Sequence, residues 1–336
     1  MSTSRNLNID MARLCACIAV VLLHTTGRTI YAYGTVGDLS FGVANFLNSA
    51  TRWCVPVFVM ISGALALSKP INDSGAFLWR RTQTILIPLI VWSGVYLGWR
   101  VRYYNEPFSW EWAGREVLAT TPYYHLYFLF LIAGLYAFAQ AFAAMVHSLS
   151  ERQSTVLALG VTGIASLTAV TSGLGSNAFT HFIPYIGYII LGAVLAKHPW
   201  PLKYVLPGFL IAIVSATALT AMLVKIYGPM GRWGLYFHTY FSPTVIIMSI
   251  SAFCILMQIP WTTKLTPLVA TLAPLTLGVY LIHPMLLEWL RWQWTAYFPE
   301  MLQPALDIPV SFTLVLMLSA LLVFMGRKIP LFRRAF

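Results

Sequence analysis

The chain has 336 residues, of which 59% are hydrophobic and only 9% are charged. An ordinary soluble domain is charged at roughly a quarter of its residues, and its surface needs that charge to stay dispersed in water. The composition therefore excludes a water-soluble enzyme, a disordered protein and a disulfide-stapled secreted domain, and it predicts an all-α polytopic membrane protein. The net charge of +11 does not indicate a nucleic-acid partner, because the basic residues are scattered singly between apolar segments.

Apolar segments long enough to cross a hydrocarbon core of roughly 30 Å recur along the whole chain. We predict about ten transmembrane helices, at 11–29, 43–67, 83–102, 124–146, 154–171, 180–196, 205–224, 240–258, 268–288 and 308–326. The first segment lacks an Ala-x-Ala-type cleavage site, so we interpret it as a retained span. The loops between the segments are short, and we expect one integral-membrane domain over residues 1–336.

The distribution of Lys and Arg predicts the orientation, because basic residues accumulate on the cytoplasmic side of a membrane. An even number of spans places both termini on one side. The basic residues on that side are Arg5, Lys69, Arg80, Arg81, Arg152, Lys197, Lys203, Lys264, Arg327, Lys328, Arg333 and Arg334. The opposite side holds only Arg28, Arg100, Arg102, Arg115, Lys225, Arg232 and Arg291. We therefore expect both termini in the cytoplasm.

The first predicted span contains ionisable side chains within the membrane. Placing such a side chain in a membrane costs free energy, so these residues are candidates for a functional site. Arg13 and His24 are eleven residues apart, so they emerge from nearly the same helix face, roughly 16 Å apart along the axis. Asp10 lies one turn before Arg13 and is expected to pair with it. We place Arg13 near the cytoplasmic edge and His24 past the middle of the membrane.

This spacing suits a long acyl donor with an anionic head in the cytoplasm and a reactive end deep in the membrane, which is the shape of a coenzyme A thioester. The guanidinium of Arg13 suits phosphate, and the imidazole of His24 suits proton removal from a hydroxyl. Two alternatives remain: Arg13 is a topology anchor that reaches the interface, and His24 makes a hydrogen bond that packs helices.

The pattern Asp-x-x-Arg followed by a His in the first span resembles the membrane acyltransferase-3 family. Further segments extend the resemblance nearly end to end: Phe58-x-x-x-Ser62-Gly63, Phe77–Pro88, Tyr124–Tyr136, Pro184–Gly192 and Gly278–Pro284. Members of that family are integral-membrane enzymes that move acyl groups, usually acetyl, from cytoplasmic coenzyme A thioesters to extracytoplasmic carbohydrate. The resemblance thus implies an O-acetyltransferase of the bacterial inner membrane.

The resemblance also implies roles for individual residues. Arg13, Arg80 and Arg81 bind acetyl-CoA, which is the acyl donor and a co-substrate. His24 acts as general base on the acceptor hydroxyl or carries the acyl group briefly. The family's basic motif usually has two Arg separated by two residues, whereas Thr84 follows Arg81 here. Either Arg80 and Arg81 together bind the donor, or the donor is held differently. The alternative for Arg80 and Arg81 is that they only anchor the cytoplasmic end of the span as positive-inside residues.

A second group of polar residues is expected in the outer halves of the spans, where it would line a cavity for a sugar. These acceptor-side candidates are Arg52, His125, His283 and Glu288. A structural ion pair is the alternative for Arg52 and Glu288. We interpret His181 and His238 as interfacial residues. Ser62-Gly63 is interpreted as a pair of small residues that leaves room for a close helix approach or for the pantetheine arm of the donor. We do not interpret Ser62 as a nucleophile, because no base stands beside it in the sequence.

The sequence therefore predicts an acetyltransferase that modifies a lipid-linked or cell-surface glycan among membrane lipids. No metal-ligand spacing occurs and all four cysteines lie in apolar segments, so we expect no metal cofactor. The alternative function is a transporter or flippase of a glycan or organic anion. Such proteins commonly show broken helices and internal symmetry, and neither is evident in the sequence.

Overall fold

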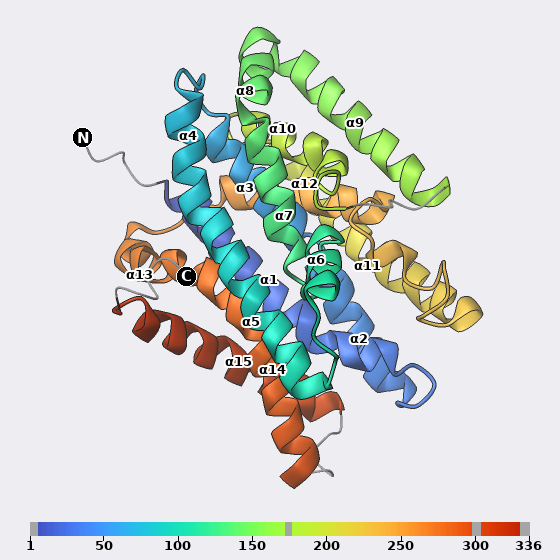
Figure 1. Cartoon of the computed structure of the whole chain (residues 1–336). Coiled ribbons are helices and arrows are strands. Elements are labelled where there is room, and N and C mark those ends of the chain that lie inside the picture. Colours follow the sequence, from blue (N-terminus) through green and yellow to red (C-terminus); the bar gives the residue numbers. More distant parts are fainter. Residues whose placement is uncertain (1–5, 172–176, 298–303, 330–336) are drawn as a thin grey trace. The chain divides into compact units, whose positions relative to one another are not determined.

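The computed structural model describes residues 6–171, 177–297 and 304–329 (Figure 1). Helices and turns make up this described part of the chain, apart from one isolated bridge between Tyr33 and Val36. Eight of its helical segments are long and apolar enough to cross a membrane. The prediction of an all-α polytopic membrane protein is therefore confirmed.

The candidate spans follow the predicted segments closely. They are Leu7–Tyr31, Asp38–Ala66, Ser74–Tyr104, Glu151–Thr171, Leu202–Tyr227, Tyr236–Gln258, Thr263–Trp294 and Asp307–Gly326. A ninth span is formed if α7 (Tyr127–Ala137) and α8 (Ala139–Ser148), which are bent by 57°, cross the membrane together. The side of the membrane on which the termini lie stays a prediction, and Arg5, Arg333 and Arg334 lie outside the described residues.

The remaining predicted segment, 180–196, the sixth in chain order, differs from a full span. It forms the shorter apolar helix Ile183–Leu195, which at 1.5 Å per residue is about 20 Å long against a hydrocarbon core of roughly 30 Å. Tyr188, Ile189 and Leu191 within it are fully buried. The side chains of this segment are apolar because they pack against other parts of the protein. Hydropathy does not distinguish a helix buried in protein from a helix that contacts lipid.

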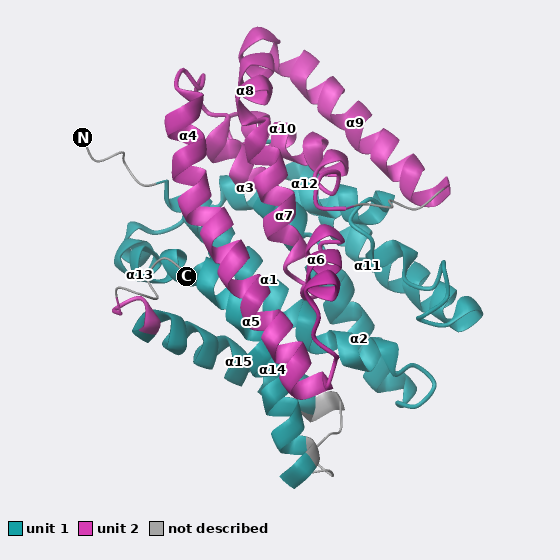
Figure 2. Ribbon diagram, viewed as in Figure 1, with its two compact units in different colours: residues 1–58, 198–325 teal, residues 59–197, 326–336 magenta. Residues whose placement is uncertain are grey.

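The chain divides into two compact units, coloured separately in Figure 2. Unit 1 comprises residues 1–58 and 198–325, and unit 2 comprises residues 59–197 and 326–336. Each unit is discontinuous in sequence, and the boundary at Phe58 falls within helix α3 (Cys54–Ala66). The single domain expected from the sequence stays a prediction.

Unit 1 is built around the first helix. Its helices are α1 (Leu7–Tyr31), α2 (Asp38–Thr51), α11 (Leu202–Tyr227), α12 (Pro243–Gln258), α13 (Thr266–Leu272), α14 (Thr276–Tyr297) and α15 (Pro304–Gly326). The side chain of Asn6 caps the start of α1 by accepting from the backbone N–H groups of Asn8 and Ile9. Helix α1 packs against α2, α12, α13 and α14, and α11 packs against α2 and α12. These contacts place α2 and α14 against the helix that carries Arg13 and His24.

Unit 2 holds the remaining helices. Besides α7 and α8 they are α4 (Ser74–Arg81), α5 (Ile87–Tyr104), α6 (Trp110–Leu118), α9 (Glu151–Thr171) and α10 (Ile186–Leu195). Helix α10 packs against α9, and α3 crosses α10 at two glycines. A Cβ atom on Gly63 would meet the backbone of Ile189, and one on Gly192 would meet the backbone of Met60. The close packing predicted for Gly63 is therefore confirmed.

A π-helical turn, Thr82–Leu86, joins α4 to α5 within the span Ser74–Tyr104. A π-turn inserts one extra residue into an α-helix and alters the pairing of nearby backbone carbonyls. The Thr84 hydroxyl donates to the carbonyls of Arg80 and Arg81, at 3.2 and 3.3 Å. Thr84, which stands where the resembling family usually has Arg, thus satisfies the backbone at this irregular turn.

The segment after α5 is held by one arginine. The Arg100 guanidinium binds the Glu106 carboxylate at 2.7 and 3.0 Å and the Glu116 carboxylate at 2.7 Å. Arg100 also donates to the Thr121 carbonyl at 2.9 Å. These bonds fold residues 105–121 of unit 2 back onto the end of α5. The sequence analysis counted Arg100 only as one of the basic residues at span ends and did not predict these bonds.

This cluster makes stability depend on pH. Glu116 lies outside the candidate spans; burial raises the pKa of its carboxyl, but hydrogen bonds from Arg100 and Thr121 outweigh burial and hold the pKa below its ordinary value. A lowered folded-state pKa adds stability that is present above the ordinary value of about 4.5 and is lost as the pH falls through the folded-state value. We expect wild-type protein to melt at a higher temperature than Glu116→Gln at pH 6, and the difference between the two melting temperatures to shrink as the pH falls below about 4.5.

The control for this measurement is Glu111→Gln on the same helix. Glu111 lies 4.0 Å from Arg115, and both side chains are largely exposed, so this pair contributes little. The melting temperature of Glu111→Gln is expected to track that of the wild type at both pH values. A gap between wild type and Glu116→Gln that is as wide at pH 4 as at pH 6 would contradict the assignment.

Candidate active site

Two histidines from distant parts of the sequence meet in unit 1. The ring centroids of His24 on α1 and His283 on α14 are 5.2 Å apart, with the rings tilted by 36°. His283 is fully buried, and its Nδ1 donates to the Val279 carbonyl at 3.1 Å. Because a carbonyl oxygen only accepts, the Nδ1 proton is fixed and Nε2 is the acceptor of the neutral ring. The pair therefore consists of the half-buried imidazole of His24 and the imidazole of His283, whose tautomer is defined.

Two arginines of the same unit accompany this histidine pair. The Arg291 guanidinium donates to the carbonyl of Thr25, next to His24, at 2.7 Å. Arg52, at the C-terminal end of α2, and Arg291 both interact electrostatically with His24. Fixed positive charges beside a proton-accepting group suit a site in which negative charge develops during a reaction.

A buried asparagine orients Arg52 relative to α1. The Asn48 Oδ1 accepts from Arg52 Nε at 2.7 Å, and its Nδ2 donates to the Leu23 carbonyl at 2.9 Å and to Thr26 Oγ1 at 2.8 Å. Leu23 and Thr26 flank His24 in the sequence. Asn48 therefore links the arginine to the turn of α1 that carries the histidine.

We expect Asn48→Ala to destabilise the protein by about 1–3 kcal/mol, because it removes these hydrogen bonds from a buried position. The measurement is the thermal unfolding of the purified protein in detergent. The matched control is Asn72→Ala, since Asn72 is exposed between α3 and α4. Equal melting temperatures for the two variants would show that the asparagine link contributes nothing.

His238 extends the same network. It is buried, with Ser49 Oγ 3.0 Å from its Nε2 and an Arg52 guanidinium nitrogen 3.3 Å from its Nδ1. A guanidinium only donates, so Nδ1 accepts, and Nε2 carries the proton that it donates to Ser49. His238 lies near the start of the candidate span Tyr236–Gln258, so its interfacial position stays a prediction, but its place in this buried network was not predicted. The turn 236–238 folds back onto α2 through Ser49, which no local pattern near His238 indicates.

The sequence reasoning missed Asn48, His238 and Arg291 as members of this site. One signal was present: Asn45, Asn48, Ser49 and Arg52 follow one another at positions i, i+3, i+4 and i+7. That spacing places four polar side chains on one face of an otherwise apolar helix. A polar stripe inside a membrane span indicates a face turned towards other polar groups.

The arginine at the other end of α1 forms the expected ion pair. The Arg13 guanidinium lies 3.3 Å from the Asp10 carboxylate. The Asp10 side chain is buried, whereas 30% of the Arg13 side chain is exposed. Helix α1 is unbroken from Leu7 to Tyr31, so the predicted spacing between Arg13 and His24 holds. Donor binding by Arg13 stays a prediction.

The other donor-side candidates belong to unit 2. Arg80 is exposed on α4, and its Nε donates to the Ala76 carbonyl at 3.3 Å. The Arg81 guanidinium lies over the rings of Phe77 and Tyr136, 5.1 and 4.6 Å from their centroids. Stacking on aromatic rings leaves the guanidinium edge available for further donation.

The acceptor-side candidates fall into both units. Arg52 and His283 accompany His24 in unit 1, and Glu288 is half-buried on α14 between His283 and Arg291 in the sequence. His125 is buried in unit 2, where it packs edge-on against Tyr96 at 4.9 Å and Tyr124 at 5.6 Å. The sequence grouped these four residues together, and unit 1 alone contains three of them.

The arrangement can perform acid–base chemistry. Within residues 6–171, 177–297 and 304–329, no three His, Cys, Asp or Glu side chains are placed to hold a metal ion together. The imidazole of His24 can exchange a proton, and the guanidinium groups of Arg52 and Arg291 can bind or stabilise an anion. These are the groups that an acyl transfer to a hydroxyl requires.

Comparison with known proteins gives one match. A family model described as an acyltransferase domain matches residues 6–325, which is nearly the whole chain and includes all of the candidate residues. No curated protein and no solved structure matches the chain. The family match covers the membrane-spanning helices described above. The chain belongs to the membrane acyltransferase-3 family and is a multi-pass membrane acyltransferase.

Proposed function

We propose that this acyltransferase moves an acetyl group from cytoplasmic acetyl-CoA to a hydroxyl of an extracytoplasmic or lipid-linked carbohydrate, in the bacterial inner membrane. The observation that carries the proposal is the environment of His24. It is an imidazole within a candidate span, in contact with His283 and accompanied by Arg52 and Arg291. A transfer across the membrane at such a site delivers the acetyl group without moving the whole coenzyme.

In the proposed reaction, His24 takes the proton of the acceptor hydroxyl, and the oxygen attacks the thioester carbonyl. A C–O bond forms, and the C–S bond breaks as the tetrahedral intermediate collapses. The coenzyme A thiolate leaves and receives a proton, so the products are the acetyl ester and the free thiol. Arg52 and Arg291 supply positive charge for the oxyanion of the intermediate.

A two-step version uses the same residues. His24 attacks the thioester first and carries the acetyl group as an acyl-imidazole, which the acceptor hydroxyl then resolves. Covalently bound label on the protein after mixing with labelled acetyl-CoA alone would support this version. Its absence in protein that transfers acetyl normally would support direct transfer.

The proposed acceptor side consists of Arg52, His125, His283 and Glu288, which would hydrogen-bond a sugar. The fixed tautomer of His283, with Nε2 as acceptor, suits a sugar hydroxyl that donates. The proposed donor side consists of Arg13, Arg80 and Arg81, which bind the phosphates of coenzyme A. All three donor-side residues keep an exposed or half-exposed side chain.

Donor binding is tested by thermal stability, because a ligand stabilises the folded protein without the acceptor being known. We expect acetyl-CoA at 100 times its Kd to stabilise wild-type protein by about 2.7 kcal/mol. Arg13→Ala is expected to weaken donor binding at least ~10-fold, because it removes a phosphate partner worth more than 1.4 kcal/mol. The control Arg28→Ala, in the last turn of the same helix, should respond as the wild type does.

Arg13→Ala also removes a partner of the buried Asp10, so the double variant Asp10→Asn/Arg13→Gln is measured beside it. Both variants should fold and be stabilised less than the wild type by the same concentration of acetyl-CoA. Saturating acetyl-CoA that leaves the melting temperature of wild-type protein unchanged would contradict the proposal. Flux of a glycan or organic anion into sealed vesicles without consumption of the donor would then support the transporter alternative.

A further inference from the structure

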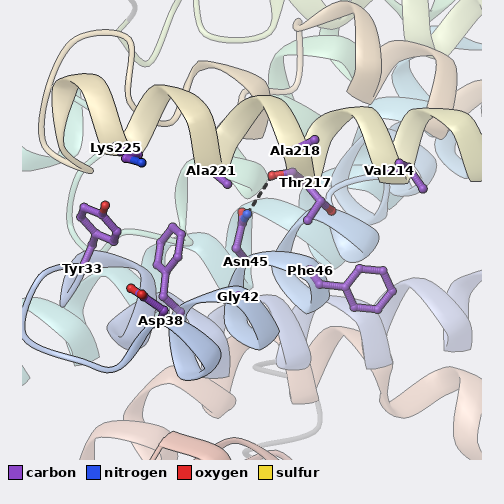
Figure 3. Close-up of a pocket in the computed structure, with 11 residues that line it drawn as sticks. Tyr33, Asp38, Gly42, Asn45, Phe46, Val214, Thr217, Ala218, Ala221 and Lys225 are labelled. Atoms are coloured by element: carbon purple, nitrogen blue, oxygen red, sulfur yellow. Dashed lines mark hydrogen bonds between the residues drawn. The ribbon is translucent and has the colours of Figure 1, made fainter.

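An open groove runs between α2 and α11 in unit 1 (Figure 3). Its volume is about 660 Å³, within the range of roughly 300–1,000 Å³ typical of small-molecule sites. One end carries Tyr33, Asp38 and Lys225, whereas Phe46 and Val214 line the other end. The groove therefore has a charged end and an apolar end, and of its lining residues only Asn45 belongs to the polar stripe of α2 that reaches the site around His24.

The charged end lies where two candidate spans terminate. Asp38 is the first residue of α2, and Lys225 lies in the last turn of α11. Whichever way the protein faces, these ends of the spans mark a membrane–water boundary. Among the described residues, no ion pair joins Asp38 to Lys225 or either of them to another side chain. A carboxylate and an ammonium group thus face one groove with their charges available to a ligand.

The apolar part of the groove is about as deep as one leaflet. Phe46 lies eight residues after Asp38 on α2, and Val214 lies eleven residues before Lys225 on α11. At 1.5 Å per residue these distances are about 12 and 16 Å. Half of a hydrocarbon core of roughly 30 Å is about 15 Å. A single acyl chain of the adjacent leaflet matches that depth, whereas a partner helix would need the full span.

Small side chains keep the groove open, and a hydrogen bond holds its walls together. A Cβ atom on Gly42 would meet nothing within 4 Å, and Ala218 and Ala221 face it from α11 (Figure 3). Between the helices, the buried Asn45 donates through Nδ2 to the Thr217 carbonyl at 2.9 Å. The groove is therefore a constant feature of the α2–α11 contact and does not depend on one side-chain rotamer.

We propose that this groove binds a zwitterionic phospholipid with a primary amine, of the phosphatidylethanolamine type. Lys225 binds the phosphate, Asp38 binds the ammonium group, and one acyl chain lies along Phe46 and Val214. The opposite charges of the groove match the opposite charges of this headgroup. An anionic headgroup would match Lys225 but would be repelled by Asp38. The inference goes beyond the acyl-transfer function and does not rest on it.

The proposal is tested with purified, delipidated protein in detergent, to which lipids with identical acyl chains are added. Phosphatidylethanolamine is expected to raise the melting temperature at a lower concentration than phosphatidylglycerol or phosphatidylcholine. Phosphatidylcholine is weaker because its quaternary ammonium has no N–H group to donate to Asp38. An equal or larger response to phosphatidylglycerol would overturn the proposal.

Two kinds of variant locate the response in the groove. Gly42→Leu fills the open space, and Gly163→Leu is its control, because a Cβ atom on Gly163 of α9 also meets nothing within 4 Å. Gly42→Leu should melt like the wild type without lipid and lose at least ~10-fold in apparent lipid affinity, whereas Gly163→Leu should retain the response. A full response in Gly42→Leu would overturn the proposal.

Charge variants test the headgroup contacts. Lys225→Ala and Asp38→Ala should each reduce the preference for phosphatidylethanolamine, and the double variant Asp38→Lys/Lys225→Asp should restore it, because the two charges exchange places. Retention of the full preference in both single variants would overturn the proposal. Stabilisation by acetyl-CoA should be unchanged in all of these variants. This measurement therefore distinguishes an error in the lipid-binding proposal from an error in the proposed acyl-transfer function.

Discussion

His24→Ala is expected to reduce acetyl transfer by about 10²–10⁴-fold, the contribution typical of a positioned general base. The loss should fall on turnover, because His24 acts at the reacting hydroxyl and Arg13 at the far end of the donor. Stabilisation by acetyl-CoA should therefore be retained in His24→Ala. The measurement is incorporation of labelled acetyl groups into membrane glycan, in membranes that contain equal amounts of each variant.

The matched control is His147→Ala. His147 also lies on a helix of the membrane region, but it is exposed and its imidazole lies 3.1 Å from the Leu67 carbonyl in unit 2, away from His24 in the chain. Its replacement should leave the rate of transfer within about twofold of the wild type. A normal rate in His24→Ala, at normal abundance, would show that another group accepts the proton.

Gly63→Ala and Gly192→Ala are expected to destabilise unit 2 by about 1–3 kcal/mol each or more, the usual cost of overpacking. A Cβ atom at Gly63 would meet the backbone of Ile189, and one at Gly192 would meet the backbone of Met60. Backbone atoms cannot rotate out of the way as a side chain does, so α3 and α10 must move apart. The measurement is the melting temperature in detergent, supported by the yield of folded protein.

Gly163→Ala on α9 is the control for this pair, because its new Cβ atom meets open space. It should stabilise slightly, by up to ~1 kcal/mol, since Ala favours helix more than Gly does. The double variant Gly63→Ala/Gly192→Ala should cost less than the sum of the single variants, because one separation of the helices relieves both clashes. Wild-type melting temperatures in both single variants would contradict the close approach.

Hydropathy predicted most of the fold because it is a local property of each segment. The run from Leu7 to Tyr31, for example, is apolar enough to span by itself, and its single unbroken helix keeps Arg13 and His24 at the predicted spacing. The segment Ile183–Leu195 departed from the prediction because its apolar side chains are buried by protein. A helix that packs inside a protein and one that faces lipid share the same composition.

The candidate site was only partly predictable, because it depends on contacts between distant segments. His24 and His283 were both singled out from the cost of ionisable groups in a membrane, but their contact depends on how α1 packs against α14. Arg291 was counted only as a basic residue at a span end. Counting charges cannot reveal that Arg291 donates to the Thr25 carbonyl. An arginine near a span end can point towards water or towards the other helices, and the sequence is the same in both cases.

The π-helical turn at Thr82–Leu86 places one extra residue between the basic residues of α4 and helix α5. Deleting a single residue within it would restore regular α-helical winding, and the span Ser74–Tyr104 would stay continuous. Because the extra residue lies within the wider turn, its loss would leave Arg80 and Arg81 at nearly the same angle around the helix axis. Arg81 would then keep its place over the ring of Tyr136. The span can therefore change its length by one residue at this turn without redirecting its basic face.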